Sequence, residues 1–190
     1  PAALPMSVSH RTYRREPSFT VAIARDPAFN FMYEANIRYL HHLGEVTYFS
    51  PLADISLPDA GFVYLPGGYP ELYLAALSAN RPMLQSIRRY VENGGKLLAE
   101  CGGMMYLCDE IRDKNGDVYP MAGVLHQSAT MENMKLRLGY RTLLYNDARL
   151  KGHEFHYSRL VEQQDPLPSC AVAYTAKGVE TDTPLYHYKN

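Results

Sequence analysis

Four short apolar runs in the first hundred residues set the predicted framework of this chain. They cover residues 19–24, 46–49, 60–65 and 96–100. Their interiors are hydrophobic rather than alternating, which is the pattern of strands buried on both faces of a parallel sheet. Amphipathic stretches separate them, so the pattern predicts an α/β fold with a mostly parallel central sheet and flanking helices.

Two longer stretches carry apolar residues at helical spacing. In the first, Asp26 and Pro27 suit the N-cap and first turn of a helix that Gly44 ends. Its apolar stripe is Phe29, Met32, Tyr33, Ile37 and Leu40. In the second, Asn80 is the predicted N-cap and Gly94 the end. Its stripe is Met83, Leu84, Ile87, Tyr90 and Val91.

The pattern changes after residue 117. Apolar and polar or small residues alternate between residues 135 and 142, which is the period of a half-exposed strand. The alternating set is Leu136, Leu138, Tyr140 and Thr142. Residues 146–147 form a predicted turn, and residues 153–158 and 170–175 are predicted as further strands. The α/β first half is therefore expected to lead into a β-rich second half.

Composition narrows the possible functions of this chain. Its 190 residues suit one domain with a substantial core. A net charge of −1 gives no basic surplus for nucleic acid or a membrane surface, and no apolar run approaches the length of a membrane span. The three cysteines include no C-x-x-C pair, which argues against a disulfide framework or metal site and for a reducing, cytoplasmic location.

The two ends of the sequence suggest a larger protein. Residues 1–18 hold three prolines and a cluster of arginines without an amphipathic period, so they are predicted to be a linker. Residues 19–190 form the predicted domain. Its last residues carry no terminal helix or cap, so we expect the domain to be cut short at its C-terminus.

Cys101 stands at the centre of the candidate chemistry. An apolar strand precedes it, Gly102 and Gly103 follow it, and Met104 begins a predicted helical stripe that includes Leu107, Cys108 and Ile111. A strand that turns sharply into a helix, with small residues beside the apex, is typical of a nucleophile elbow. The helix N-terminus would favour the thiolate. The alternative is that Cys101 is a buried structural cysteine of a βα unit. Cys108 is predicted to be a core residue.

A Gly67-Gly68 pair follows the predicted strand at residues 60–65. Glycines there can expose backbone N–H groups as part of an oxyanion hole. Ligands of α/β folds gather at the carboxyl ends of the parallel strands, where this loop and Cys101 should both lie. A plain tight turn is the alternative.

Four segments, in this order, resemble class I glutamine amidotransferases, and among them the glutaminase domains of the cobyrinic acid a,c-diamide synthase family. They are residues 24–31 (ARDPAFNF), 65–71 (LPGGYPE), 99–107 (AECGGMMYL) and 152–158 (GHEFHYS). The resemblance implies a flavodoxin-like fold in which Cys101 attacks glutamine. It implies an oxyanion hole at Gly67, Gly68 and Gly102, with no metal or cofactor in this domain.

The resemblance also implies a partner domain. An N-terminal synthetase domain, using ATP and Mg²⁺, would amidate carboxylates a and c of a corrinoid with ammonia from this domain. The acceptor, cobyrinate or its cobalt-free counterpart, stays open. Two rival hypotheses remain: a cysteine hydrolase or chaperone of the DJ-1/PfpI type, suggested by Glu100 beside the cysteine, and a non-catalytic docking module.

The general base is the incomplete part of the predicted site. Family members place it in a late segment resembling Ser-Tyr-hydrophobic-His, which we expect beyond Asn190. His156 is the fallback, and His153 should face the other side of the same strand. His126 and His187 are predicted to be surface residues. Residues 1–190 alone are therefore expected to hydrolyse glutamine poorly.

Overall fold

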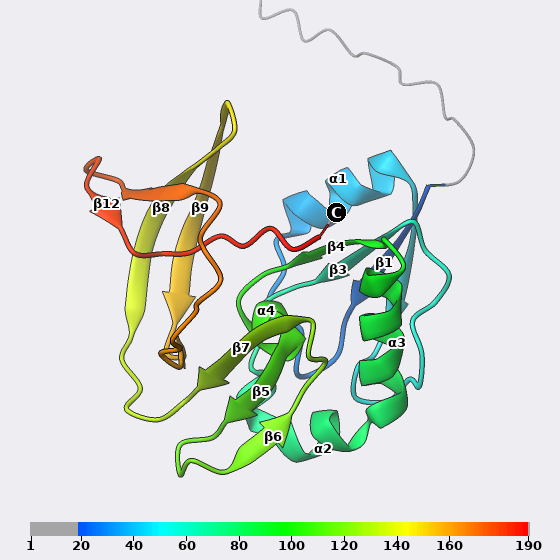
Figure 1. The fold of residues 1–190 in the computed structure, drawn as a ribbon. Helices are drawn as coiled ribbons and strands as arrows, with labels where there is room; N and C mark the ends of the chain where they lie inside the picture. Colours follow the sequence, from blue (N-terminus) through cyan, green and yellow to red (C-terminus); the bar gives the residue numbers. More distant parts are fainter. Residues whose placement is uncertain (1–18, 190) are drawn as a thin grey trace, which may run out of the picture.

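The computed structural model describes residues 19–189, so the predicted linker at residues 1–18 lies outside them. A four-stranded parallel sheet forms its first half, in the order β2-β1-β3-β4 (Figure 1). Its strands are β1 (Thr20–Ala24), β2 (Glu45–Phe49), β3 (Phe62–Leu65) and β4 (Lys96–Ala99). The predicted parallel sheet is thus confirmed. In its register Leu65 lies opposite Ala99, so the loops after β3 and β4 begin side by side.

Helices cover both faces of this sheet. The helices are α1 (Glu34–Leu43), α2 (Leu74–Ala79), α3 (Arg81–Glu92) and α4 (Gly102–Leu107), with a 3₁₀ turn, η1, at Pro70–Leu72. Ala22 and Val63 face a large core with α2, α3 and α4, whereas Ile23 faces α1 through Ile37 and Leu40. The alternation of buried side chains along β1 therefore places core on both sides, as the unbroken apolar run predicted.

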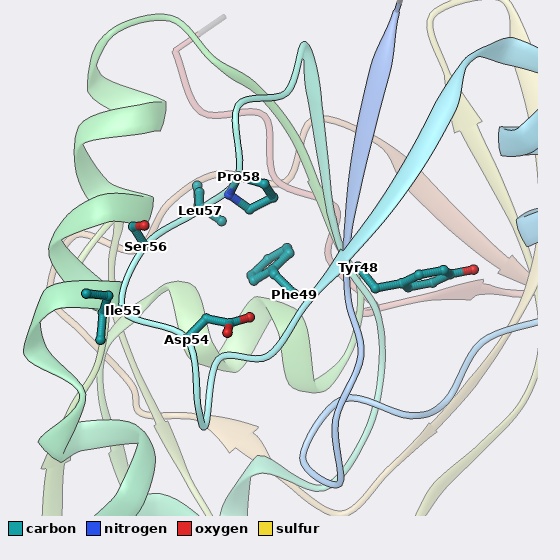
Figure 2. Close-up of a pocket in the computed structure, with 7 residues that line it drawn as sticks. All are labelled: Tyr48, Phe49, Asp54, Ile55, Ser56, Leu57 and Pro58. Carbon is teal, nitrogen blue, oxygen red and sulfur yellow. The ribbon is translucent and has the colours of Figure 1, made fainter.

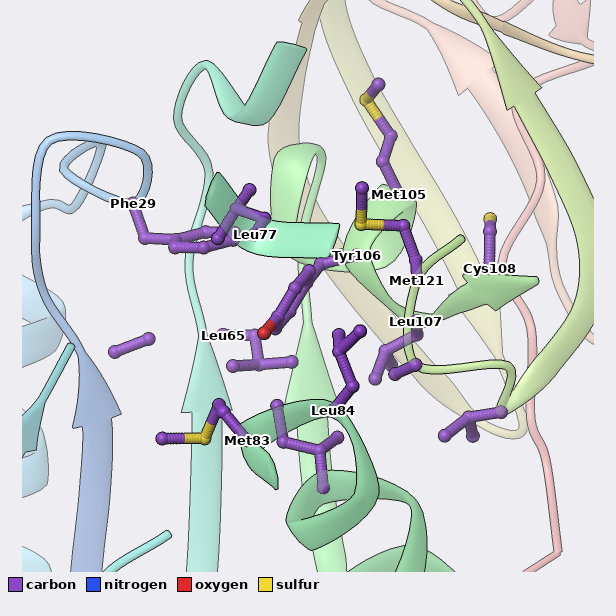
Figure 3. Packing of buried hydrophobic residues seen from close by; sticks show 14 of the residues in the cluster. Phe29, Leu65, Leu77, Met83, Leu84, Met105, Tyr106, Leu107, Cys108 and Met121 are labelled. Carbon is purple, nitrogen blue, oxygen red and sulfur yellow. The ribbon is translucent and has the colours of Figure 1, made fainter. Parts of the chain in front are cut away.

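The predicted second helix is confirmed as α3. Asn80 caps it by accepting the N–H of Met83 at 3.4 Å, and the same side chain donates to the carbonyl oxygen of Pro51 at 2.8 Å. The inward stripe includes Met83, Ile87 and Val91, which are all buried. Figure 3 shows Met83 and Leu84 of this helix packed with Leu65 and Tyr106.

The predicted start of the first helix at Asp26 is wrong, because α1 begins at Glu34. The Asp26 carboxylate instead accepts the N–H groups of Ala28 and Phe29 at 2.8 and 3.1 Å. It also accepts the Ser50 hydroxyl at 2.9 Å, which ties this turn to the loop after β2. Asp26 therefore stabilises a compact turn instead of a helix N-terminus.

The helix after Cys101 is also shorter than predicted. It ends at Leu107, and β5 (Cys108–Arg112) follows at once. The carbonyl oxygens of Tyr106, Leu107 and Cys108 accept N–H groups from residues 122–124 at 2.8–3.1 Å. Those bonds replace the i to i+4 bonds that would have continued the helix. Cys108 is fully buried, as predicted.

Two further four-stranded sheets make the second half β-rich, as predicted (Figure 1). The second sheet has the order β10-β7-β5-β6, with β6 (Val118–Pro120), β7 (Leu125–Thr130) and β10 (Arg159–Leu160). The third has the order β12-β11-β8-β9 and is antiparallel. Its strands are β8 (Arg137–Tyr145), β9 (Ala148–His156), β11 (Val172–Thr175) and β12 (Glu180–Thr181).

The β8–β9 hairpin turns at Asn146, whose φ of 50° is the left-handed conformation that tight hairpin turns use. The predicted half-exposed strand is present as β8. Its exposed face is the apolar one: Leu138 and Tyr140 are 62% and 77% exposed, whereas Arg141 is half-buried on the opposite face. Among residues 19–189, no helix is long and apolar enough to span a membrane.

Candidate active site

Cys101 occupies the joint between β4 and α4. Its φ of 51° and ψ of −112° lie in a region that residues other than glycine rarely adopt. Such strain costs of order 1–3 kcal/mol and persists where the surroundings fix it, commonly at active sites. The strand–turn–helix geometry predicted for the elbow is therefore present, with Cys101 at its apex.

The glycines after Cys101 are required by close packing. A Cβ at Gly103 would lie 2.2 Å from the carbonyl oxygen of Leu65, and a Cβ at Gly102 would lie 2.7 Å from Cδ of Pro70. Both contacts are far shorter than van der Waals separation. The start of α4 can therefore approach β3 and η1 only without side chains at these two positions.

The Gly67-Gly68 loop lies against the elbow. A Cβ at Gly68 would lie 2.1 Å from the carbonyl oxygen of Ala28, and a Cβ at Gly67 would lie 3.5 Å from Cβ of Cys101. The Gly67 carbonyl accepts the Phe31 N–H at 3.0 Å, which clamps the loop from the side of the Asp26 turn. The structure thus brings Gly67, Gly68, Gly102 and Cys101 together, as the sequence predicted.

Cys101 is an exposed residue, but the protein around its sulfur removes enough solvent to raise the pKa of the thiol above its ordinary value. Hydrogen bonds from the N–H groups of Gly102 and Gly68 lower this pKa, while the negative charges of Glu71 and Glu100 raise it. The N–H of Gly102, at the start of α4, acts in the expected direction and favours the thiolate, but the loss of solvent around the sulfur outweighs it. Both N–H groups lie near the sulfur, and donors of an oxyanion hole must point at the substrate oxygen that forms beside it.

Strand β9 forms the opposite wall. The Phe155 carbonyl oxygen lies 3.8 Å from Sγ of Cys101. His156, the fallback base, has both ring nitrogens engaged: Nε2 pairs with Glu154 Oε1 and Nδ1 with the Ser158 carbonyl oxygen, each at 2.8 Å. In this arrangement His156 has no free nitrogen for Cys101.

Glu154 anchors this wall and was missed by the sequence analysis. Its buried carboxylate pairs with Arg141 at 2.5 Å and accepts the Thr183 hydroxyl at 3.0 Å. Burial raises the pKa of Glu154, but the hydrogen bonds from His156, Thr183 and Arg141 outweigh it and hold the pKa below its usual range. The hairpin register places Arg141 near Glu154, which spacing within one strand does not reveal.

Three other histidines of the described residues make no hydrogen bond to the Cys101 sulfur. His153 faces away from His156, as predicted, and its Nδ1 lies 2.7 Å from the Tyr33 hydroxyl, beside the Phe31 ring. His126 is exposed on β7, where its Nδ1 lies 3.4 Å from Asp109, and His187 is exposed in the C-terminal segment. Both are exposed, as predicted, and His187 also lines the cleft that contains Cys101.

A cleft of about 1340 Å³ opens above Cys101. Its walls include the two glycine loops, the β8–β9 hairpin and the C-terminal segment at residues 182–188. A second pocket, of about 280 Å³, lies beyond β2 (Figure 2). Tyr48, Asp54 and Ile55 are among its lining residues, and the lining contains no cysteine or histidine. We therefore place the candidate active site in the larger cavity, which contains Cys101 and is called the cleft below.

Within residues 19–189, no cluster of side chains is suited to hold a metal ion.

Comparison with known proteins identifies the family. Residues 20–189 match the model of the CobB/CobQ-like glutamine amidotransferase domain. The hydrogenobyrinate a,c-diamide synthase of Pseudomonas aeruginosa is 42% identical over 160 residues, covering 84% of this chain and 35% of that protein. The cobyrinate a,c-diamide synthase of Fusobacterium nucleatum is 46% identical over 145 residues, covering 74% and 33%. The chain thus spans about a third of the length of these curated relatives.

Solved structures agree on the fold. The structure of PurLQS from Thermotoga maritima has a TM-score of 0.56 at 16% identity and covers 88% of this chain and 87% of that one. A crystal structure of a glutamine amidotransferase has a TM-score of 0.54 at 17% identity, covering 84% and 86%. These likenesses show the fold predicted from the sequence, and the family match extends over nearly all described residues. This chain belongs to the CobB/CobQ-like glutamine amidotransferase domain family.

Proposed function

We propose that this chain is the glutaminase part of a cobyrinate or hydrogenobyrinate a,c-diamide synthase. The observation that carries the proposal is the placement of Cys101 in a strained elbow against which the Gly67-Gly68 loop and Gly102 are closely packed. The names of the relatives supply the acceptor, a corrinoid carrying carboxylates a and c. The ammonia released from glutamine would amidate these carboxylates, and the reaction would take place in the cytoplasm.

The proposed hydrolysis follows from the elbow geometry. The Cys101 thiolate attacks the carboxamide carbon of glutamine, and the oxygen becomes an oxyanion held by the N–H groups of Gly68 and Gly102. Each such donor contributes roughly 3–4 kcal/mol to the transition state. The C–N bond then breaks, the nitrogen takes a proton and leaves as ammonia, and a γ-glutamyl thioester remains. Water attacks the thioester, which releases glutamate and restores the thiol.

A histidine would move the protons in both steps. His156 is a poor candidate because Glu154 and the Ser158 carbonyl already engage its ring. We propose that the base lies beyond Asn190. β4 is the edge strand of the parallel sheet in the described part of the chain, with Leu98 45% exposed, so a further strand could pair there beside Cys101.

The synthetase chemistry would reside in a second domain. This domain would bind ATP and Mg²⁺ and activate the corrinoid carboxylates, and the ammonia released at Cys101 would complete the amide. The share of the relatives that this chain covers, about a third, is consistent with such a partner. The hydrolysis itself needs no metal or cofactor, because a thiol, two N–H donors and a base suffice.

The test uses the full-length protein with ATP, Mg²⁺ and cobyrinate or hydrogenobyrinate, supplied with either glutamine or ammonium chloride. Cys101→Ala should lose glutamine-dependent amidation and keep ammonium-dependent amidation. Cys170→Ala, at an exposed cysteine outside the cleft, should keep both. Full glutamine-dependent amidation by Cys101→Ala, or no amidation of either corrinoid by the wild type, would contradict the proposal.

A further inference from the structure

Glu71 is a charged residue of the cleft that the hydrolysis above does not use. It lies in η1, three residues after Gly68, and lines the cleft together with Cys101. Its neighbour Pro70 is buried and closely approaches the position of a Gly102 Cβ, at 2.7 Å. The backbone that carries Glu71 is therefore fixed with respect to the elbow.

The Glu71 carboxylate has no cationic partner within 4.0 Å among residues 19–189, although the residue is only partly exposed. Two other acidic residues of the cleft differ, since Glu154 pairs with Arg141 and Asp182 with Arg137. Burial raises the pKa of Glu71. An unpaired, partly buried carboxylate is unfavourable unless a ligand supplies the missing positive charge.

The charge of Glu71 also opposes the chemistry of the free enzyme. Among neighbouring charges it contributes most to raising the pKa of Cys101, ahead of Glu100. Glu100 is exposed, and its carboxylate accepts the Tyr64 hydroxyl at 2.5 Å. A negative charge beside a nucleophilic thiol is useful only if substrate binding neutralises it.

We propose that Glu71 binds the α-ammonium group of glutamine and so selects an α-amino acid over a simple amide. This inference rests on the proposed glutaminase activity. An ammonium group paired with Glu71 cancels the charge that disfavours the thiolate, so binding of the substrate itself promotes ionisation of Cys101. In the free protein the thiol stays protonated and is less open to adventitious alkylation or oxidation.

The test measures ammonia release by the full-length protein from glutamine and from 4-carbamoylbutanoate, which is glutamine without its amino group. Glu71→Gln should lower kcat/KM for glutamine at least tenfold, mainly through KM. It should leave kcat/KM for 4-carbamoylbutanoate unchanged or higher, because the charge that opposes the thiolate is gone and this substrate has no ammonium group to lose. If hydrolysis of 4-carbamoylbutanoate is below detection, its inhibition constant against glutamine replaces kcat/KM. Glu100→Gln removes the same charge from the other carboxylate near Cys101. It should leave the ratio of kcat/KM for the two substrates within twofold of the wild-type ratio.

A second measurement separates this role from a structural one. Without substrate, iodoacetamide should alkylate Cys101 faster in Glu71→Gln than in the wild type at pH 7.5, because the opposing charge is gone. Unchanged substrate selectivity, or unchanged or slower alkylation, would overturn the role of Glu71. The proposed function fails separately, if wild type and Cys101→Ala release ammonia from glutamine equally.

Discussion

Replacing Gly103 by alanine places a methyl carbon 2.2 Å from the carbonyl oxygen of Leu65, at the end of β3. The φ angle of Gly103 suits alanine, so the effect is steric. Relief of the contact requires α4 to move by about 1 Å, and a displacement of that size at a catalytic group can lower the rate on the order of 100-fold. Overpacking of this kind lowers the free energy of unfolding by ~1–3 kcal/mol, whereas the better helix propensity of alanine raises it by at most ~1 kcal/mol.

The assay compares glutamine-dependent ammonia release and thermal unfolding of the full-length protein in Gly103→Ala and Gly152→Ala. The matched control lies on β9, where a Cβ would meet no atom within 4 Å. We expect turnover to fall about 100-fold and the melting transition to move down in Gly103→Ala only. If the two variants behave alike, close approach of α4 to β3 does not position Cys101.

Two further predictions concern protonation. Because the pKa of Cys101 is raised, its alkylation by iodoacetamide should keep accelerating above pH 9, as followed by mass spectrometry. A plateau below pH 8 would contradict loss of solvent as the dominant influence on this pKa. The lowered pKa of Glu154 predicts that its network stabilises the folded protein above about pH 4 and that this contribution disappears as the pH falls through the folded pKa. Glu154→Gln should cost about 1–3 kcal/mol at pH 7, because the half-buried Arg141 guanidinium loses its charged partner and keeps only its bonds to Thr183 and to the Tyr140 carbonyl oxygen. It should also flatten the acid side of the stability profile measured by chemical unfolding. A variant with wild-type stability at pH 7 would refute this.

The parts of the fold that follow from local pattern were predictable. The interiors of β1, β3 and β4 are continuous apolar runs, and α3 combines an inward stripe with a side-chain cap at Asn80. Asp26 shows where local rules fail. Asp-Pro suits a helix N-terminus equally well, but the Asp26 carboxylate has a partner 24 residues away, at Ser50, that no local pattern contains.

The same distinction applies to the site. Cys101 and the glycines of both loops were predictable because an elbow and a close loop need small residues at fixed positions. The direction of the Cys101 pKa shift could not be predicted, because it depends on how far the fold removes solvent from the sulfur and on Glu71, which comes from a different loop. The partners of His156 likewise depend on the register of the β8–β9 hairpin, which places Arg141 beside Glu154.

The central claim is that Cys101 is the glutamine-directed nucleophile. The most direct measurement treats the full-length protein with an electrophilic glutamine analogue and maps the adduct among Cys101, Cys108 and Cys170. The account predicts one stoichiometric adduct on Cys101, prevented by excess glutamine. Cys108 should stay unmodified because it is fully buried. Labelling of Cys108 or Cys170 with Cys101 untouched would contradict the account.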